Sequence, residues 1–124
     1  MAEKKKILIV EDEPNMLRLL KETLEENQFE TVIAKDGDEG LKKAKKEKPD
    51  LILLDVIMPK MDGLTMLYEL RKDSWGKKAK VMILTNLSDA ESVGAALNSG
   101  VYDFLVKADW KLADVVKEVK ERLK

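Results

Sequence analysis

The stretch Leu51-Ile52-Leu53-Leu54, followed directly by Asp55, decides the fold of this chain. Four consecutive aliphatic residues are too few for a helix, and they do not alternate with polar ones. They therefore predict a strand that is buried on both faces. Four further segments predict strands, the last two more weakly: Ile7-Leu8-Ile9-Val10, Val81-Met82-Ile83-Leu84, Thr31-Val32-Ile33-Ala34 and Tyr102 to Val106.

Helical patterns lie between these strands. Apolar residues recur at helical spacing from Met16 to Leu24 and from Leu112 to Leu123. Asp36-x-x-Glu39 and Ser88-x-x-Glu91 have capping-box spacing at the starts of the second and fourth expected helices. Other start and break signals are Pro14, Pro49, Gly63 and Gly100. Five strands that alternate with five helices predict an α/β fold, (βα)₅, with a doubly wound parallel five-stranded sheet.

Composition narrows the chemistry. The 124 residues fit one domain, and Lys+Arg 23 against Asp+Glu 24 leave a net charge of −1. The chain has no histidine and no cysteine, which excludes imidazole catalysis, thiolate nucleophiles and His- or Cys-ligated zinc. The balanced charge argues against direct nucleic-acid binding, and Lys4-Lys5-Lys6 is expected to be a solvated terminus. We expect a cytoplasmic protein without a membrane span.

Polar residues follow the strands at the edge where such sheets bind ligands. Glu11-Asp12 follow the first strand, Asp55 the third, Thr85-Asn86 the fourth and Lys107 the fifth. Each has a simpler explanation: Glu11 or Asp12 could cap the first helix, and Lys107 could pair with any acid. Lys35, after the second strand, is expected to lie outside the group.

Three neighbouring carboxylates repel one another unless a cation relieves them. A set of oxygen ligands without imidazole favours a hard ion such as Mg²⁺. With a lysine, a hydroxyl and a backbone N–H added, the same edge suits a phosphoryl group, and an aspartate can itself be the nucleophile.

The segment from Asp55 to Gly63, DVIMPKMDG, matches the pattern D-x-x-M-P-x-M-D-G. It resembles the phosphoacceptor loop of the receiver domains of bacterial two-component response regulators, and the chain is most similar to single-domain, chemotaxis-regulator-like members. The resemblance covers roughly Lys5 to Leu123. It implies a flavodoxin-like fold with strand order 2-1-3-4-5.

The resemblance also implies roles for individual residues. Asp55 resembles the phosphoacceptor, Lys107 the lysine that pairs with the phosphate, and Thr85 the switch hydroxyl. Phe104 stands at the switch-aromatic position, where ordinary packing is an alternative. The backbone N–H of Asn86 is expected to contact the phosphate. The Mg²⁺ ligands would be Glu11 (largely through water), Asp12, Asp55 and the backbone carbonyl of Ile57.

The implied function is that of a phosphoacceptor in a two-component phosphorelay, not of an enzyme in the ordinary sense. The expected partners are a sensor histidine kinase or a histidine phosphotransfer protein, and a downstream protein that binds the face of helix four, strand five and helix five. We expect a monomer with one domain over residues 1–124 and no output domain, either free-standing or trimmed from a longer regulator.

Two positions depart from the family pattern. Ala108 replaces the usual proline after the lysine, so a trans bond is expected there. Asn86 replaces a smaller residue, and we expect it to slow hydrolysis, which gives a long-lived aspartyl phosphate.

Several alternatives remain at this stage. A phosphatase that uses Asp55 as its nucleophile would need an acid two residues further on, but position 57 is an isoleucine. A nucleotide-binding protein would need a phosphate-binding loop of the type G-x-x-x-x-G-K-[ST], and the sequence contains none. In a flavin-binding protein, Glu11-Asp12-Glu13 would repel the phosphate of the flavin. A phosphorylation-independent scaffold is the main rival, and an engineered or consensus-like receiver without a dedicated partner is another.

Overall fold

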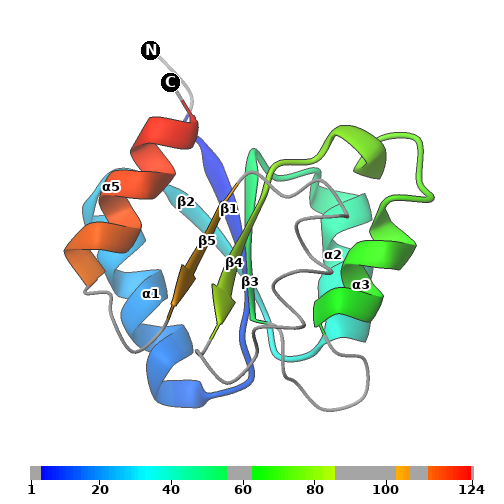
Figure 1. The fold of residues 1–124 in the computed structure, drawn as a ribbon. Coiled ribbons are helices and arrows are strands. Elements are labelled where there is room, and N and C mark those ends of the chain that lie inside the picture. The colour runs from blue at the N-terminus through cyan, green and yellow to red at the C-terminus, as the bar shows by residue number, and fades with distance from the viewer. Residues whose placement is uncertain (1–3, 56–62, 86–102, 107–111, 124) are drawn as a thin grey trace.

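The computed structural model describes residues 4–55, 63–85, 103–106 and 112–123. The backbone forms a five-stranded parallel sheet with helices on both faces (Figure 1). The strands are β1 (Lys6–Val10), β2 (Glu30–Ala34), β3 (Leu51–Asp55), β4 (Val81–Thr85) and β5 (Asp103–Val106). The helices are α1 (Pro14–Glu26), α2 (Gly37–Glu47), α3 (Gly63–Leu70), a 3₁₀ turn η1 (Gly76–Lys78) and α5 (Leu112–Arg122).

The strand order is β2-β1-β3-β4-β5, and every neighbouring pair is parallel. This order confirms the flavodoxin-like (βα)₅ architecture that the resemblance implied. All five expected strands are present, with bounds that differ by a residue or so from the expected ones. The expected fourth helix, with its capping signal at Ser88, lies outside the described residues.

The central strands are buried on both faces, as their unbroken aliphatic runs predict. Leu8 and Leu54 belong to one core cluster, under α2 and α3, whereas Ile7 and Leu53 belong to the other, under α1 and α5. Figure 1 shows these helix pairs on opposite sides of the sheet. Neighbouring residues of one strand point to opposite faces, so a run of four apolar residues serves two cores at once.

The helix starts carry the expected signals. Pro14 is the first residue of α1, and the Asp36 side chain accepts the backbone N–H of Glu39 at 2.8 Å at the start of α2. Lys48 ends α2 in the left-handed conformation, with φ 47°. These signals set where the loops at the carboxyl ends of β1 and β2 turn into helices.

Candidate functional site

The acidic cluster at the carboxyl ends of β1 and β3 is formed by Glu11, Asp12 and Asp55. Val10 pairs with Leu54 in the parallel ladder, so Glu11 and Asp55 follow paired residues on adjacent strands. The backbone N–H of Glu11 continues the ladder by donating to the Ala34 carbonyl at 3.0 Å. The two central strands therefore bring their acids together by register alone.

The carboxylate oxygens that these three residues offer lie within 4.8 Å of one another. Glu11 is 1% exposed and Asp55 7%, whereas Asp12 is exposed. Glu11 also accepts the backbone N–H of Asp12 at 3.2 Å. Two buried carboxylates and one at the surface thus form a small pocket of oxygen ligands that opens to solvent on the Asp12 side.

The capping of α1 falls to a residue that sequence reasoning had not selected. Glu13 accepts the backbone N–H groups of Asn15 at 3.1 Å and Met16 at 2.7 Å. The alternative in which Glu11 or Asp12 caps this helix is therefore wrong. Because Glu13 satisfies the free N–H groups of the first turn, the carboxylates of Glu11 and Asp12 are left to the cluster.

This cluster fits a hard divalent cation. Three acids within one ligand shell repel one another in a partly buried site, and a cation that binds oxygen offsets that repulsion. No imidazole or thiolate is available anywhere in the sequence. Glu11, Asp12 and Asp55 are therefore the side chains that would hold such an ion.

Of the other predicted site residues, Thr85 and Phe104 are among those that the structure describes, and they lie on β4 and β5, the two strands that follow β3 in the sheet. Thr85 is the last residue of β4 and pairs with Val106 at the end of β5, and Asp55 pairs with Leu84. Phe104 lies within β5, in register with Ile83. Lys107, the next residue after Val106, lies outside the described residues, as do Asn86, Ile57 and Ala108.

A cavity of about 320 Å³ lies beside the cluster, between α1 and the end of β2. Asp12 and Lys35 both line it, together with residues of α1. Lys35 thus shares this cavity with Asp12, a member of the acidic cluster. Sequence patterns give no signal for this cavity, because it depends on how α1 packs against β2.

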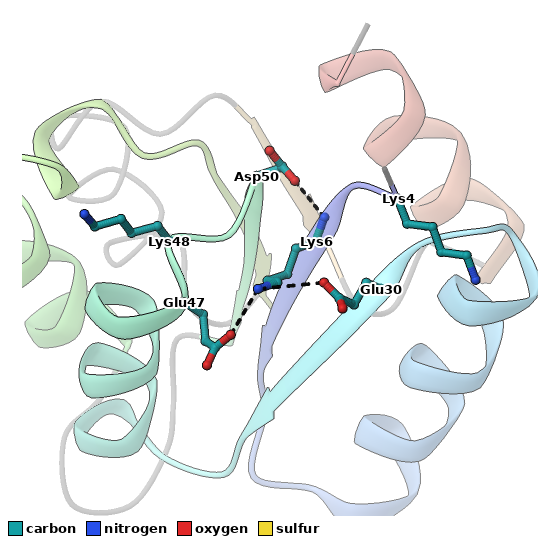
Figure 2. A pocket seen from close by; sticks show the side chains of 6 residues that line it. All are labelled: Lys4, Lys6, Glu30, Glu47, Lys48 and Asp50. Carbon is teal, nitrogen blue, oxygen red and sulfur yellow. Dashed lines mark hydrogen bonds and ion pairs between the residues drawn. The ribbon is translucent and has the colours of Figure 1, made fainter. Parts of the chain in front are cut away.

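A larger cavity, of about 600 Å³, lies at the opposite edge of the sheet. Figure 2 shows its charged residues from the amino ends of β1 and β2 and the end of α2. The Lys6 ammonium lies 3.0 Å from Glu47 Oε1 and 3.7 Å from Glu30 Oε2, and the Lys6 backbone N–H donates to Asp50 at 2.7 Å. The expectation that Lys6 belongs to a solvated terminus is wrong, because these acids hold it against the sheet.

Contacts with Glu47 and Glu30 also move ionisation equilibria. The hydrogen bond to Glu47 raises the pKa of Lys6 and lowers the pKa of Glu47. Glu30 and Glu47 of this cavity are thus paired with the Lys6 ammonium, and Asp50 accepts the Lys6 backbone N–H. The opposite edge, where Asp55 lies, is therefore the better candidate for chemistry.

Comparison with known proteins agrees with this geometry. Residues 7–120 match the family described as the response regulator receiver domain. The alkaline phosphatase synthesis transcriptional regulatory protein PhoP of Bacillus subtilis is 39% identical over 103 residues, which are 83% of this chain and 42% of that protein. The DNA-binding response regulator MtrA of Mycolicibacterium smegmatis is 32% identical over 98% of this chain and 51% of its own length. The chain thus spans about half the length of these relatives.

Solved structures share the whole fold. Chemotaxis protein CheY4 of Vibrio cholerae matches with a TM-score of 0.88 at 29% identity, over 97% of this chain and 99% of that one. The signal receiver domain of a histidine kinase from Syntrophus aciditrophicus matches with a TM-score of 0.86 at 36% identity, over 96% and 89%. Among the described residues, no helix has the length and apolar character that crossing a membrane requires.

Proposed function

The chain belongs to the response regulator receiver domain family, and on this premise we propose that Asp55 accepts a phosphoryl group from a phosphohistidine on a partner protein. The observation that carries the proposal is the meeting of Glu11, Asp12 and Asp55 within 4.8 Å at the carboxyl ends of two central strands. The donor histidine lies outside these 124 residues, since none of them is a histidine. A sensor histidine kinase or a histidine phosphotransfer protein supplies it.

The Asp55 carboxylate is the nucleophile in this proposal. One of its oxygens attacks the phosphorus, the P–N bond to the partner's imidazole breaks, and the electron pair leaves with the imidazole nitrogen. Asp12, Asp55, the carbonyl of Ile57 and, largely through water, Glu11 would hold Mg²⁺, which would supply positive charge for the phosphoryl oxygens. Lys107 adds a second positive charge, and the N–H of Asn86 and the hydroxyl of Thr85 donate hydrogen bonds.

The added phosphate then acts as a switch. It places new negative charge beside Thr85, and movement of Thr85 and Phe104 passes this change to the face of helix four, β5 and α5, where a downstream protein binds. Thr85 and Phe104 lie on adjacent strands, which supports this route. We further propose that the domain acts as a monomer in the cytoplasm and does not contact nucleic acid directly. Its aspartyl phosphate is proposed to be long-lived.

The test is a phosphorylation experiment with the whole chain. Incubation with Mg²⁺ and acetyl phosphate should give an adduct of about 80 Da by mass spectrometry, the mass that one phosphoryl group adds to a carboxylate. Asp55→Asn should remove it, because an amide is not a nucleophile of this kind. Asp38→Asn, at a half-exposed aspartate on α2, serves as the matched control and should keep the adduct.

Two results would contradict the proposal. An adduct that persists in Asp55→Asn would assign the phosphate to another residue. Complete absence of an adduct in the unmodified chain, with acetyl phosphate and with a phosphorylated histidine phosphotransfer protein, would favour the phosphorylation-independent scaffold.

A further inference from the structure

The cavity between α1 and the end of β2 has an apolar floor. Pro14 and Leu17 of α1 and Ile33 of β2 contribute the apolar side chains. Its volume of about 320 Å³ falls in the range of small-ligand sites, roughly 300–1,000 Å³. It is therefore large enough for a short hydrocarbon chain or one aromatic ring.

The rim of this cavity is cationic. Arg18, Lys21 and Lys35 line it, against a single acid, Asp12. The Lys21 ammonium is paired with Glu25 at 2.9 Å. Arg18 and Lys35 are exposed, and the described part of the chain offers neither of them an ion pair. Arg18 and Lys35, which have no ion pair with any described residue, thus border the apolar floor.

We propose that this cavity binds a small organic carboxylate with an apolar body. The hydrocarbon would cover Leu17 and Ile33, and the carboxylate would lie between Arg18 and Lys35. Only Asp12 belongs both to this cavity and to the acidic cluster. The site shares Asp12 with the acidic cluster but none of its other lining residues, and its test does not require phosphoryl transfer at Asp55.

A titration with straight-chain carboxylates tests the site. Butanoate, hexanoate and octanoate would be added to the ¹⁵N-labelled chain, and amide shifts of Leu17, Arg18, Ile33 and Lys35 would be followed by NMR. We expect saturable shifts in this set, with affinity rising roughly two- to fourfold per methylene, because each one removes more apolar surface from water. Hexanamide, which lacks the charge, should bind more weakly than hexanoate.

Variants test the role of the cations. Arg18→Gln and Lys35→Gln should each weaken hexanoate binding by about two- to fivefold, the effect of losing one exposed charge pair. Lys42→Gln, on the exposed side of α2, is the control and should leave the affinity unchanged. All three positions are exposed, so the amide spectrum should show folded protein. Three results would overturn the proposal: an affinity that does not change with the chain length of the carboxylate, hexanamide binding as tightly as hexanoate, or both cavity variants binding hexanoate as tightly as the unmodified chain.

Discussion

Asp12 shows how one side chain can favour a site and oppose folding at once. Its carboxylate lies within 4.8 Å of two carboxylates that are almost fully buried. Like charges at such distances raise the free energy of the folded chain unless a cation is bound. The residues that would hold a metal ion therefore make the metal-free protein less stable than it would otherwise be.

Asp12→Asn tests this balance. Without Mg²⁺, the variant should be more stable than the unmodified chain by about 0.5–1 kcal/mol, the size of one partly exposed charge interaction. Added Mg²⁺ should stabilise the unmodified chain more than the variant, because the variant has lost one anionic ligand. Urea unfolding with and without Mg²⁺ measures both effects. Asp38→Asn, which loses a surface pair with Lys42, is the control. If Asp12→Asn is less stable than the unmodified chain in EDTA, repulsion between the carboxylates does not destabilise the metal-free protein.

At the scale of the element, the end of α2 carries local backbone strain. Lys48 has φ 47° and ψ 60°, and its N–H donates to the Ala44 carbonyl at 2.9 Å. A side chain in this left-handed conformation costs about 1–2 kcal/mol, and glycine avoids the cost. Pro49 disfavours the right-handed helical conformation at the residue before it, so the helix ends at Lys48. The left-handed conformation of Lys48 is a common helix cap, although lysine adopts it at a cost that glycine avoids.

Lys48→Gly should raise the free energy of unfolding by about 0.5–1 kcal/mol, since relief of the strain exceeds the extra freedom that glycine has in the unfolded chain. Lys45→Gly, at an exposed position within α2, should lower it by about 1 kcal/mol. Thermal or urea unfolding of the two variants gives the comparison. Destabilisation of equal size in both would show that the backbone at Lys48 is not strained.

The elements themselves were largely predictable from local pattern. The aliphatic runs at β1, β3 and β4 identified buried strands, and Pro14 and Asp36 identified helix starts. The cap of α1 was not predictable in the same way. Glu11, Asp12 and Glu13 are all acids, and only the path of the backbone between β1 and α1 determines that Glu13 reaches the free N–H groups.

For the molecule as a whole, the two edges of the sheet have different electrostatic roles. At the carboxyl edge, three acids from the ends of β1 and β3 lie within 4.8 Å of one another. At the amino edge, Lys6 joins β1 to Glu30 of β2 and Glu47 of α2 (Figure 2). The first arrangement suits a ligand, whereas the second is satisfied within the chain and contributes to stability.

The Lys6 contacts predict a defined pH dependence. Because the pKa of Glu47 is lowered in the folded chain, Glu47 stabilises the fold at pH values above its ordinary pKa of 4.5. This stabilisation is lost as pH falls through the lowered pKa. Because the pKa of Lys6 is raised in the folded chain, Lys6 stabilises the fold at pH values below its ordinary pKa of 10.5. This stabilisation is lost as pH rises through the raised pKa. Lys6→Met should therefore be less stable than the unmodified chain between these limits, and the difference should close at both ends.

Urea unfolding across that pH range measures the difference. Lys42→Met, whose side chain is 76% exposed in its pair with Asp38, is the control and should show little change at any pH. A stability difference for Lys6→Met that is constant from acid to alkaline pH would mean that packing of the lysine stem, not its charge, accounts for the effect.

What the amino-acid sequence by itself determined was the five strands, the starts of α1 and α2, the family and the three acids that meet in the cluster. Those follow from local chemistry: apolar runs, capping residues and a motif around Asp55. Tertiary structure alone decided that Glu13 caps α1, that Lys6 is held by two acids, and that Arg18 and Lys35 border an apolar cavity. The Glu13 cap depends on the path of the backbone between β1 and α1. The Lys6 contacts and the cavity depend on which side chains meet across elements distant in the chain, and therefore on packing and register.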